Sequence, residues 1–281
     1  MARHALLLLM VLFAANCVRA TPSLDVIELV RNRDFNSLEA HFNAIQSSFE
    51  QGKTDEYALL DSFRPFYTRT DVLSDELKEW TDAHPKSYVA HLARGTYYRK
   101  LGELNRGTSV SRDVPRAAMN YMDQVFEISE KELTTALPLR RNPYLAVLNL
   151  LNIARYRSDT VASDRYLAEG NRLLPGNMLV RARYLDHLKP RWGGSYAAMA
   201  AFVQRSKLEG VDAANLGLLS AMINDDKGFV AQTNGNLELA VATYKLALSQ
   251  AEHANPRLQR DYLSAATFAC QRGALGSVRC P

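Results

Sequence analysis

Hydrophobic residues recur along the chain at helical spacing. Leu38, Phe42, Ile45 and Phe49 follow one another at steps of four, three and four, which places them on one face of an α-helix. Comparable stripes continue along the chain, and no segment has the sustained alternation of apolar and polar residues that is typical of strands. The pattern therefore predicts an all-α fold.

Proline and glycine mark the ends of the predicted helices. One helix is expected to stop at His84, because the residue before Pro85 is disfavoured in the helical conformation. Gly102 is expected to end the next helix, and Pro115 suits the first position of a long one. Further helices are predicted over 143–157, 163–174, 177–188, 195–207, 212–223, 226–234, 236–251 and 256–271. Their short connections favour antiparallel packing of neighbouring helices.

The hexapeptide PRWGGS, which begins at Pro190, interrupts this helical pattern. Proline has no backbone N–H to continue a helix, and Gly193 and Gly194 tolerate positive φ values that other residues avoid. Ser195 is a favoured N-cap. The segment is therefore predicted to be a structural turn between two helices.

Trp192 lies in the middle of this turn and permits two interpretations. In the first, its ring fills the corner between the two helices. In the second, Trp192 and Arg191 form a rim that contacts a ligand. The corner is the favoured interpretation, because aromatic residues between packed helices usually belong to the core.

One stretch resembles a helical repeat. From Gly228, the chain places Ala231, Gly235, Ala240 and Tyr244 at successive steps of three, four, five and four, with a further small residue at 247. This spacing resembles a tetratricopeptide repeat, a helix pair that stacks with its neighbours. The best-matching unit is 212–251. The resemblance implies a right-handed superhelix or solenoid of antiparallel helix pairs, built from degenerate tetratricopeptide-like repeats.

Three stretches resemble a narrower family. They are RDFNSLEAHFNAIQSSFEQG near the start, PKSYVAHLARGTYY at 85–98 and LKPRWGGSYAAMAAFV at 188–203. Together they are similar to an uncharacterised bacterial domain of unknown function that carries the Pro-Arg-Trp-Gly-Gly-Ser signature, over residues 25–207. The resemblance implies a helical-repeat fold and brings no catalytic role to any residue.

The first twenty residues have the pattern of a signal peptide. A basic start is followed by an apolar run from Ala5 to Ala15, and Val18-Arg19-Ala20 supplies a cleavage site before Thr21. The apolar run is about half of what a membrane-spanning helix needs. We expect residues 21–281 to form one helical-repeat domain, exported to the periplasm or secreted, without a transmembrane segment. Lipid anchoring at Cys17 is disfavoured, because Asn16 stands where a small residue is needed.

The two remaining cysteines lie close together in the sequence. Cys270 and Cys280 flank the glycine-containing tail 270–281. In an oxidising compartment this spacing predicts a local disulfide. The alternative is two unpaired thiols; a metal site is disfavoured, because no histidine or third cysteine lies near them.

Positive charge is concentrated in the middle third of the chain. Residues 139–207 contain 12 Lys and Arg against 4 Asp and Glu, whereas residues 21–138 contain 14 against 19. This basic block is either a solvated face balanced by the acidic first third, or a surface for an acidic partner or an anionic envelope polymer. Nucleic acid is disfavoured, because no nucleic-acid-binding motif is present.

No local motif points to catalysis. The serine in GGSYA lacks the second glycine of a nucleophile elbow, and no two histidines have the spacing of a zinc protease. We expect no catalytic residue, cofactor or metal. An enzyme with a site dispersed in sequence remains an alternative, and it predicts a pocket with convergent polar groups.

A group of arginines, with one tryptophan, supplies candidate contacts to a partner. Arginines on a concave helical surface clamp carboxylates or phosphates with two hydrogen bonds, and the alternative is that they pair with acidic neighbours. We expect a non-catalytic scaffold or adaptor for a protein or peptide; the alternative is a binder of an anionic small molecule or envelope polymer. The candidate contacts are Arg94, Arg106, Arg181, Arg183, Arg191 and Trp192.

Overall fold

The computed structural model describes residues 25–68, 70, 72–107 and 113–271. In these residues the regular elements are α-helices and short 3₁₀ helices, and no strand occurs among them. The α-helices are α1 (Val26–Arg31), α2 (Phe35–Glu50), α3 (Glu56–Ser62), α4 (Ser74–Ala83), α5 (Tyr88–Arg106), α6 (Arg116–Ala136), α7 (Tyr144–Tyr156), α8 (Thr160–Leu173), α9 (Leu179–His187), α10 (Tyr196–Leu208), α11 (Ala213–Thr233), α12 (Leu237–Gln250), α13 (Pro256–Tyr262) and α14 (Ala265–Gln271). The 3₁₀ helices are η1 (Arg64–Phe66), η3 (Leu137–Leu139) and η4 (Pro190–Trp192).

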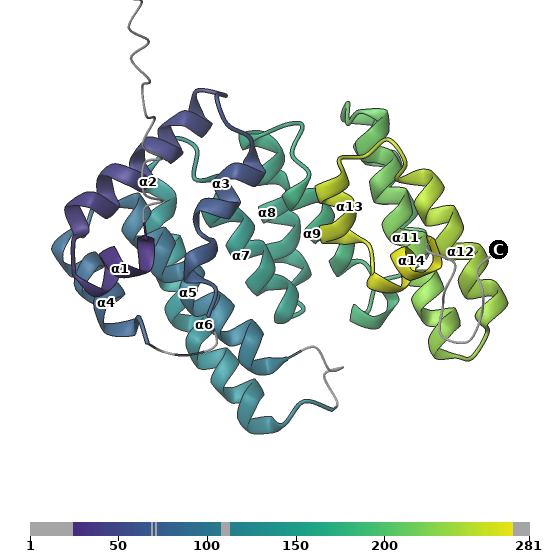
Figure 1. Cartoon of the computed structure of the whole chain (residues 1–281), viewed down its shortest axis with the longest axis horizontal. Coiled ribbons are helices and arrows are strands. Elements are labelled where there is room, and N and C mark those ends of the chain that lie inside the picture. The colour runs from purple at the N-terminus through teal and green to yellow at the C-terminus, as the bar shows by residue number, and fades with distance from the viewer. Residues whose placement is uncertain (1–24, 69, 71, 108–112, 272–281) are drawn as a thin grey trace, which may run out of the picture.

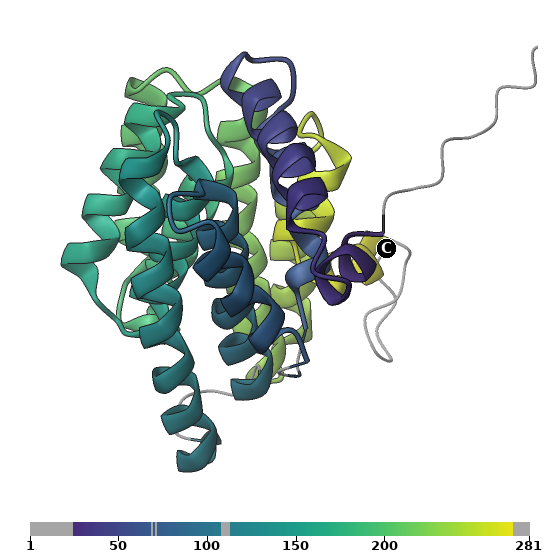
Figure 2. The ribbon, with the colours of Figure 1, turned by 90° about the vertical axis from the view of Figure 1, so that its left-hand side faces the viewer.

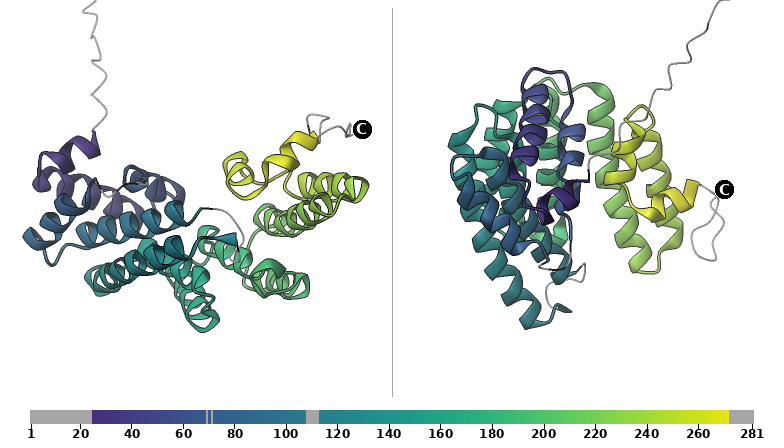
Figure 3. Two further views of the ribbon diagram at one scale, coloured as in Figure 1. Left: turned by 90° about the horizontal axis from the view of Figure 1, so that it is seen from below. Right: turned by 60° about the vertical axis from the view of Figure 1, so that its left-hand side comes forward.

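Neighbouring helices pack as hairpins along an arc. α5 packs on α6, α7 on α8 and α11 on α12, and the long helices run roughly parallel or antiparallel to one another (Figure 2). Seen from below, the arc carries α1–α4 at one end and α11–α14 at the other (Figures 1 and 3). The predicted all-α fold is confirmed for the described residues.

Helices α5, α7 and α9 form the middle of the arc. α5 contacts α7, and α7 contacts α9, while α2, α4 and η1 pack on α5 from the N-terminal end. Because elements cover these helices on several sides, every residue of α7 from Tyr144 to Ala154 is buried. This layer is the frame that positions side chains from the two ends of the chain.

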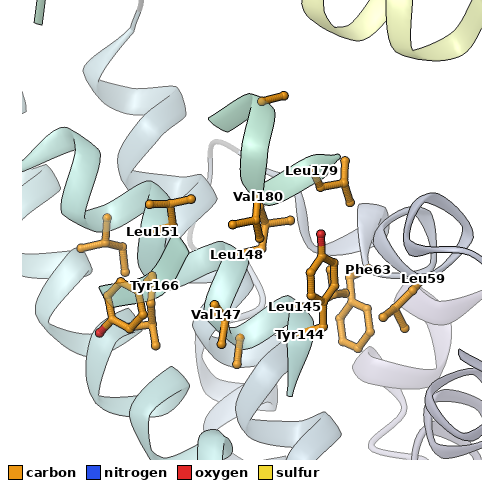
Figure 4. Close-up of a cluster of buried hydrophobic side chains, with 14 of the residues drawn as sticks. Leu59, Phe63, Tyr144, Leu145, Val147, Leu148, Leu151, Tyr166, Leu179 and Val180 are labelled. Carbon is orange, nitrogen blue, oxygen red and sulfur yellow. The ribbon is translucent and has the colours of Figure 1, made fainter. Parts of the chain in front are cut away.

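Aromatic rings fill the N-terminal part of the core. Phe42 lies 4.7 Å from Phe63 and 6.2 Å from Trp80 between ring centroids. Leu59 and Phe63 lie next to Tyr144 of α7, with Val180 of α9 beyond it (Figure 4). The apolar stripe predicted for the first long helix therefore faces the core.

Gly102 does not end a helix, contrary to the sequence prediction. A Cβ atom built on this residue would lie 2.8 Å from the Phe126 ring of α6 and 2.9 Å from the Val125 side chain. The absent side chain lets α5 approach α6, so α5 continues to Arg106 and ends where Gly107 adopts a φ of 77°. Packing between helices, and not helix termination, accounts for this glycine.

Two further boundaries differ from the prediction, and one pair of aspartates explains both. The predicted break between 223 and 226 is absent, because Asp225 and Asp226 have tertiary partners that offset their low helix propensity. Asp225 accepts a hydrogen bond from the Ser264 backbone N–H at 2.8 Å. Next to Ser264, the predicted helix 256–271 divides into α13 and α14, because Leu263 between them adopts an extended conformation.

The turn at 190–195 has the predicted elements. Residues 190–192 form η4, and Gly193 has a φ of 92°. The Ser195 hydroxyl accepts a hydrogen bond from the Ala198 backbone N–H at 3.1 Å and caps α10. Trp192 is only partly buried, so it lies at the corner without being enclosed by it.

We predict that replacing Gly194 in this turn strongly destabilises the fold. Its Cβ atom would lie 2.1 Å from the backbone oxygen of Leu188, and backbone atoms cannot move aside as a flexible side chain can. Gly194→Ala should lower the free energy of unfolding by about 3 kcal/mol, measured by urea denaturation. Gly176→Ala is the matched control, because a Cβ there has no neighbour within 4 Å. An equal loss in both variants would contradict the explanation.

Candidate functional site

Seven charged side chains meet on the face of the central layer that points toward η1 and α13. We call them the inner cluster. Its members lie on three helices and on the short connection after the last of them, and most of the side-chain surface of the ion-paired members is buried. They are Arg99, Lys100 and Glu103 of α5, Arg155 of α7, Arg183 and Asp186 of α9, and Lys189.

Glu103 is the carboxylate that holds together the members of the inner cluster on α5. Its carboxylate accepts hydrogen bonds from Arg99 Nη1 at 2.5 Å and from Lys100 Nζ at 2.8 Å. Burial raises the pKa of this carboxyl, but Arg99 and Lys100 outweigh burial and lower the pKa to about 2. Arg99 also donates through Nε to Asn149 Oδ1 of α7 at 2.5 Å. These contacts fix α5 against α7.

Asp186 has the same role on α9. Its carboxylate lies 3.0 Å from Arg155 Nη1 and 2.5 Å from Lys189 Nζ. Burial raises the pKa of Asp186, whereas Lys189 and Arg155 lower it, and the net change is a lowered pKa. Asp186 therefore remains a carboxylate that holds two cations.

Lys100 has an unusually acidic ammonium group. Burial and the adjacent Arg99 lower the pKa of Lys100 to about 8, despite the opposing effect of Glu103. Its Nζ atom lies 4.7 Å from the centroid of the Tyr67 ring. Burial is the larger cause of this shift, and the like charge of Arg99 adds to it, since both disfavour the charged form of a lysine.

Arg183 differs from the other cations of the cluster. Burial lowers its pKa, but Tyr262, Asp186 and Glu103 raise it more. The guanidinium carbon lies 5.6 Å from the Tyr262 ring centroid. Arg183 forms no hydrogen bond or ion pair with any other residue in the part of the chain that the structure describes. Arg183 is itself partly buried, and no acceptor for its N–H groups occurs among the described residues.

The cluster as a whole has a surplus of positive charge. It contains five cations and two carboxylates, and each carboxylate is already shared by two cations. Lys189 also lies 3.9 Å from Asp226, a carboxylate outside the cluster that pairs with Arg191. A partly buried arrangement of this kind strengthens binding of an added anion, because water screens the charges less than at an open surface. The inner cluster is therefore suited to accept a carboxylate or phosphate.

The C-terminal helices approach the same face. Arg257 of α13 forms an ion pair with Asp61 of α3 at 2.6 Å, and its guanidinium lies 5.5 Å from the Tyr57 ring centroid. α3 and α13 consequently lie opposite each other on the open side of the arc (Figures 1 and 3). Tyr262 at the end of α13 reaches Arg183 from this side.

Three of the arginines proposed from the sequence pair with acidic neighbours. Arg94 forms an ion pair with Glu132 at 2.5 Å, and Arg181 pairs with Glu209 at 2.6 Å. Arg191 pairs with Asp226 of α11. These contacts connect adjacent helices and match the structural alternative to partner binding.

The remaining candidates lie near the inner cluster. Arg183 belongs to it. The Arg106 guanidinium lies over the Tyr156 ring, 5.6 Å from its centroid, and 6.0 Å from that of Trp192. Three of the candidate contact residues, Arg106, Arg183 and Trp192, therefore lie on one side of the molecule. Arg94 and Arg181 lie elsewhere.

Sequence reasoning missed most of the inner cluster. Arg99, Arg155 and Lys189 belong to it, yet they are separated by dozens of residues and carry no common motif. The available signal was the i, i+4 spacing of Arg99 and Glu103, which predicts a local ion pair but not the approach of α7 and α9.

Several sequence predictions concern residues outside the described part of the chain. These are the signal peptide 1–20, Cys17 and Cys280. Cys270 is buried beside Val241 of α12, with its Sγ 4.0 Å from the Val241 oxygen. The disulfide therefore stays a prediction.

Two searches of the described residues concern metals and membranes. They contain no group of three or more His, Cys, Asp or Glu side chains placed to hold a metal ion. None of the helices described is long and apolar enough to cross a membrane.

Comparisons with known proteins give one match. Residues 23–159 match the model of a family described as Domain of unknown function (DUF4034). The match supports the resemblance of this part of the chain to an uncharacterised family; it ends before the PRWGGS turn at 190–195. No curated protein and no solved structure matches the chain.

We predict that removing the Glu103 charge destabilises the fold in a pH-dependent way. The pKa of about 2 lies below the ordinary value of 4.5, so the charge stabilises the fold fully above about pH 4.5 and less as the pH falls toward 2. Glu103→Gln should cost about 3 kcal/mol at pH 7, because two buried cations lose their partner. Urea unfolding should show this deficit shrinking between pH 4.5 and pH 3.

Glu127→Gln is the control, because Glu127 is an exposed glutamate of α6. It should change stability by less than about 0.5 kcal/mol at each pH. A Glu103→Gln deficit that is independent of pH would contradict the assigned role of the carboxylate.

Proposed function

We propose that the protein is an exported, non-catalytic adaptor that binds an acidic segment of a protein or peptide through the inner cluster. In this proposal the helix hairpins are degenerate tetratricopeptide-like repeats that form a superhelix, and residues 1–20 are removed on export. The arc of hairpins and the apolar leader support it.

The observation that carries the proposal is Arg183. A partly buried guanidinium without a protein acceptor retains donors for a ligand, and its planar fork matches a carboxylate with two parallel hydrogen bonds. Lys100 and Lys189 lie in the same cluster, and both keep some exposed side-chain surface. A second carboxylate of the bound acidic segment would therefore have these two lysines within reach.

A binding role fits the chemistry of the cluster better than a catalytic one. Glu103 and Asp186 have lowered pKa values, so they are poor proton donors and weak bases near neutral pH. The described histidines are not members of the cluster. The groups present attract and orient an anion. Lys100, with a pKa of about 8, is the one member able to exchange a proton near neutral pH, and its Nζ is held 2.8 Å from the Glu103 carboxylate.

We predict that acidic peptides bind preferentially and that Arg183 is required. The purified protein without residues 1–20 is titrated into fluorescein-labelled hexapeptides of Glu and Gly, with Gln replacing Glu in the matched set. Fluorescence anisotropy should show at least tenfold tighter binding of the acidic set, with an affinity that falls as salt rises. Arg183→Gln should remove most of this preference.

Arg31→Gln at the end of α1 is the matched control, because it removes the same charge from an exposed position outside the inner cluster. It should leave the preference unchanged. Equal losses in both variants would indicate attraction to net charge alone. Equal binding of acidic and Gln peptides by the unmodified sequence would overturn the proposal.

A further inference from the structure

A second site of different character lies on the opposite layer. An open pocket of about 750 Å³ is lined by α6, η3, the start of α7 with the connection before it, and α8. None of its lining residues belongs to the inner cluster. Its volume lies within the range of small-molecule sites in proteins. We call it the arginine pocket.

The pocket has apolar walls. Val147 of α7 and Tyr166 of α8 line it and are both buried residues of the hydrophobic core, as seen in Figure 4. Leu137 and Pro143 contribute further apolar surface. These groups suit the hydrocarbon body of a ligand, because burying apolar surface is the main favourable term for such contacts.

Four arginines and two glutamates surround these walls. Arg172 is held by Glu169, with 2.6 Å between Nη2 and Oε1, and Glu130 is paired with Arg157. The glutamates of the pocket are therefore already matched by cations. Arg140 donates to the Ser47 hydroxyl at 3.2 Å and lies 3.7 Å from Glu50.

The other two arginines lack a carboxylate partner. Arg165 donates to the Tyr166 hydroxyl at 2.9 Å and lies over the same ring, 4.7 Å from its centroid. Arg141 is exposed. Neither forms an ion pair with an acidic side chain in the described ranges. Two guanidinium groups thus border an apolar pocket without a counter-ion from the protein.

We propose that the arginine pocket binds a small amphipathic anion. The apolar body lies against Leu137 and Ala168, which line the pocket and keep accessible surface, with the buried Val147 and Tyr166 behind them. Its carboxylate, sulfonate or phosphate group is held by Arg141 and Arg165. This site is independent of the proposed peptide binding, because the two sites share no residue. The chemistry requires both parts of the ligand, an apolar chain or ring and one anionic head.

Two fluorescent probes separate the two parts. 8-Anilinonaphthalene-1-sulfonate has an aromatic body and a sulfonate, and N-phenyl-1-naphthylamine has a comparable body without charge. The sulfonate probe should bind saturably to one site per chain. The double variant Arg141→Gln/Arg165→Gln should weaken the sulfonate probe at least tenfold and change the neutral probe less than twofold.

Ala168→Trp tests the place of binding. Ala168 lines the pocket and is exposed, so a larger side chain fills the pocket without disturbing the core. This variant should remove binding of both probes while circular dichroism and the urea midpoint stay unchanged. Lys207→Gln, which removes an exposed charge on α10, should have no effect on either probe.

Competition identifies the ligand class. Laurate and dodecyl phosphate should both displace the sulfonate probe, and their relative affinities distinguish a carboxylate from a phosphate head. Inorganic phosphate and acetate should not displace it at the same concentrations. Displacement by inorganic phosphate alone, or full binding of the sulfonate probe to Ala168→Trp or to the double arginine variant, would overturn the proposal.

Loss of probe binding in Arg183→Gln would also count against the arginine pocket, because it would place the probe at the inner cluster. Conversely, a failure of acidic peptides to bind leaves the probe measurements unaffected. The two proposals therefore fail through different results.

Discussion

The fold depends on buried carboxylates that find partners on neighbouring helices. Each such group is costly to remove from water unless it is paired and hydrogen-bonded. Glu132 of α6 pairs with Arg94 and His91 of α5, and Asp226 of α11 pairs with Arg191 of η4. Hydrophobic stripes bring helices together, and these carboxylates select which helices become neighbours and at what register.

Glu56 illustrates how far this selection reaches. Burial raises the pKa of its carboxyl, while the Tyr144 hydroxyl and the backbone N–H groups of Met178 and Leu179 lower it. The net result is a raised pKa. Because the two N–H groups stand at the start of α9, Glu56 caps a helix more than a hundred residues away. The N-terminal helices are thereby attached to the layer that contains Arg183.

The local features of the fold were accessible from the sequence, and the long-range ones were not. Ser195 was predicted as an N-cap because capping depends only on a few adjacent residues. Gly102 was misassigned because its function depends on Phe126 of α6. A gap was predicted at Asp225, between helices 212–223 and 226–234, because the groups that donate hydrogen bonds to its carboxylate, on Ser264 and Thr267, are about forty residues away. Local propensity gave way to tertiary contacts at both positions.

The same limit applies to the candidate sites. Arg183 was selected from the sequence as one of several arginines, but nothing local separated it from Arg181, which pairs with Glu209. The two lie two residues apart on α9, so they point to different sides of the helix. The distinction between a structural and an available arginine arises only when the neighbouring helices are in place.

The basic block at residues 139–207 is divided between two surfaces, because its successive helices lie alternately in the central layer and outside it. α7 and α9 belong to the central layer and carry Arg155 and Arg183 toward α13, whereas the intervening α8 carries Arg165 to the other side. A run of positive charge in the sequence is therefore divided between two faces by the hairpin order. Since a layer of buried helices separates the faces, the two proposed anion sites use different arginines of the same block.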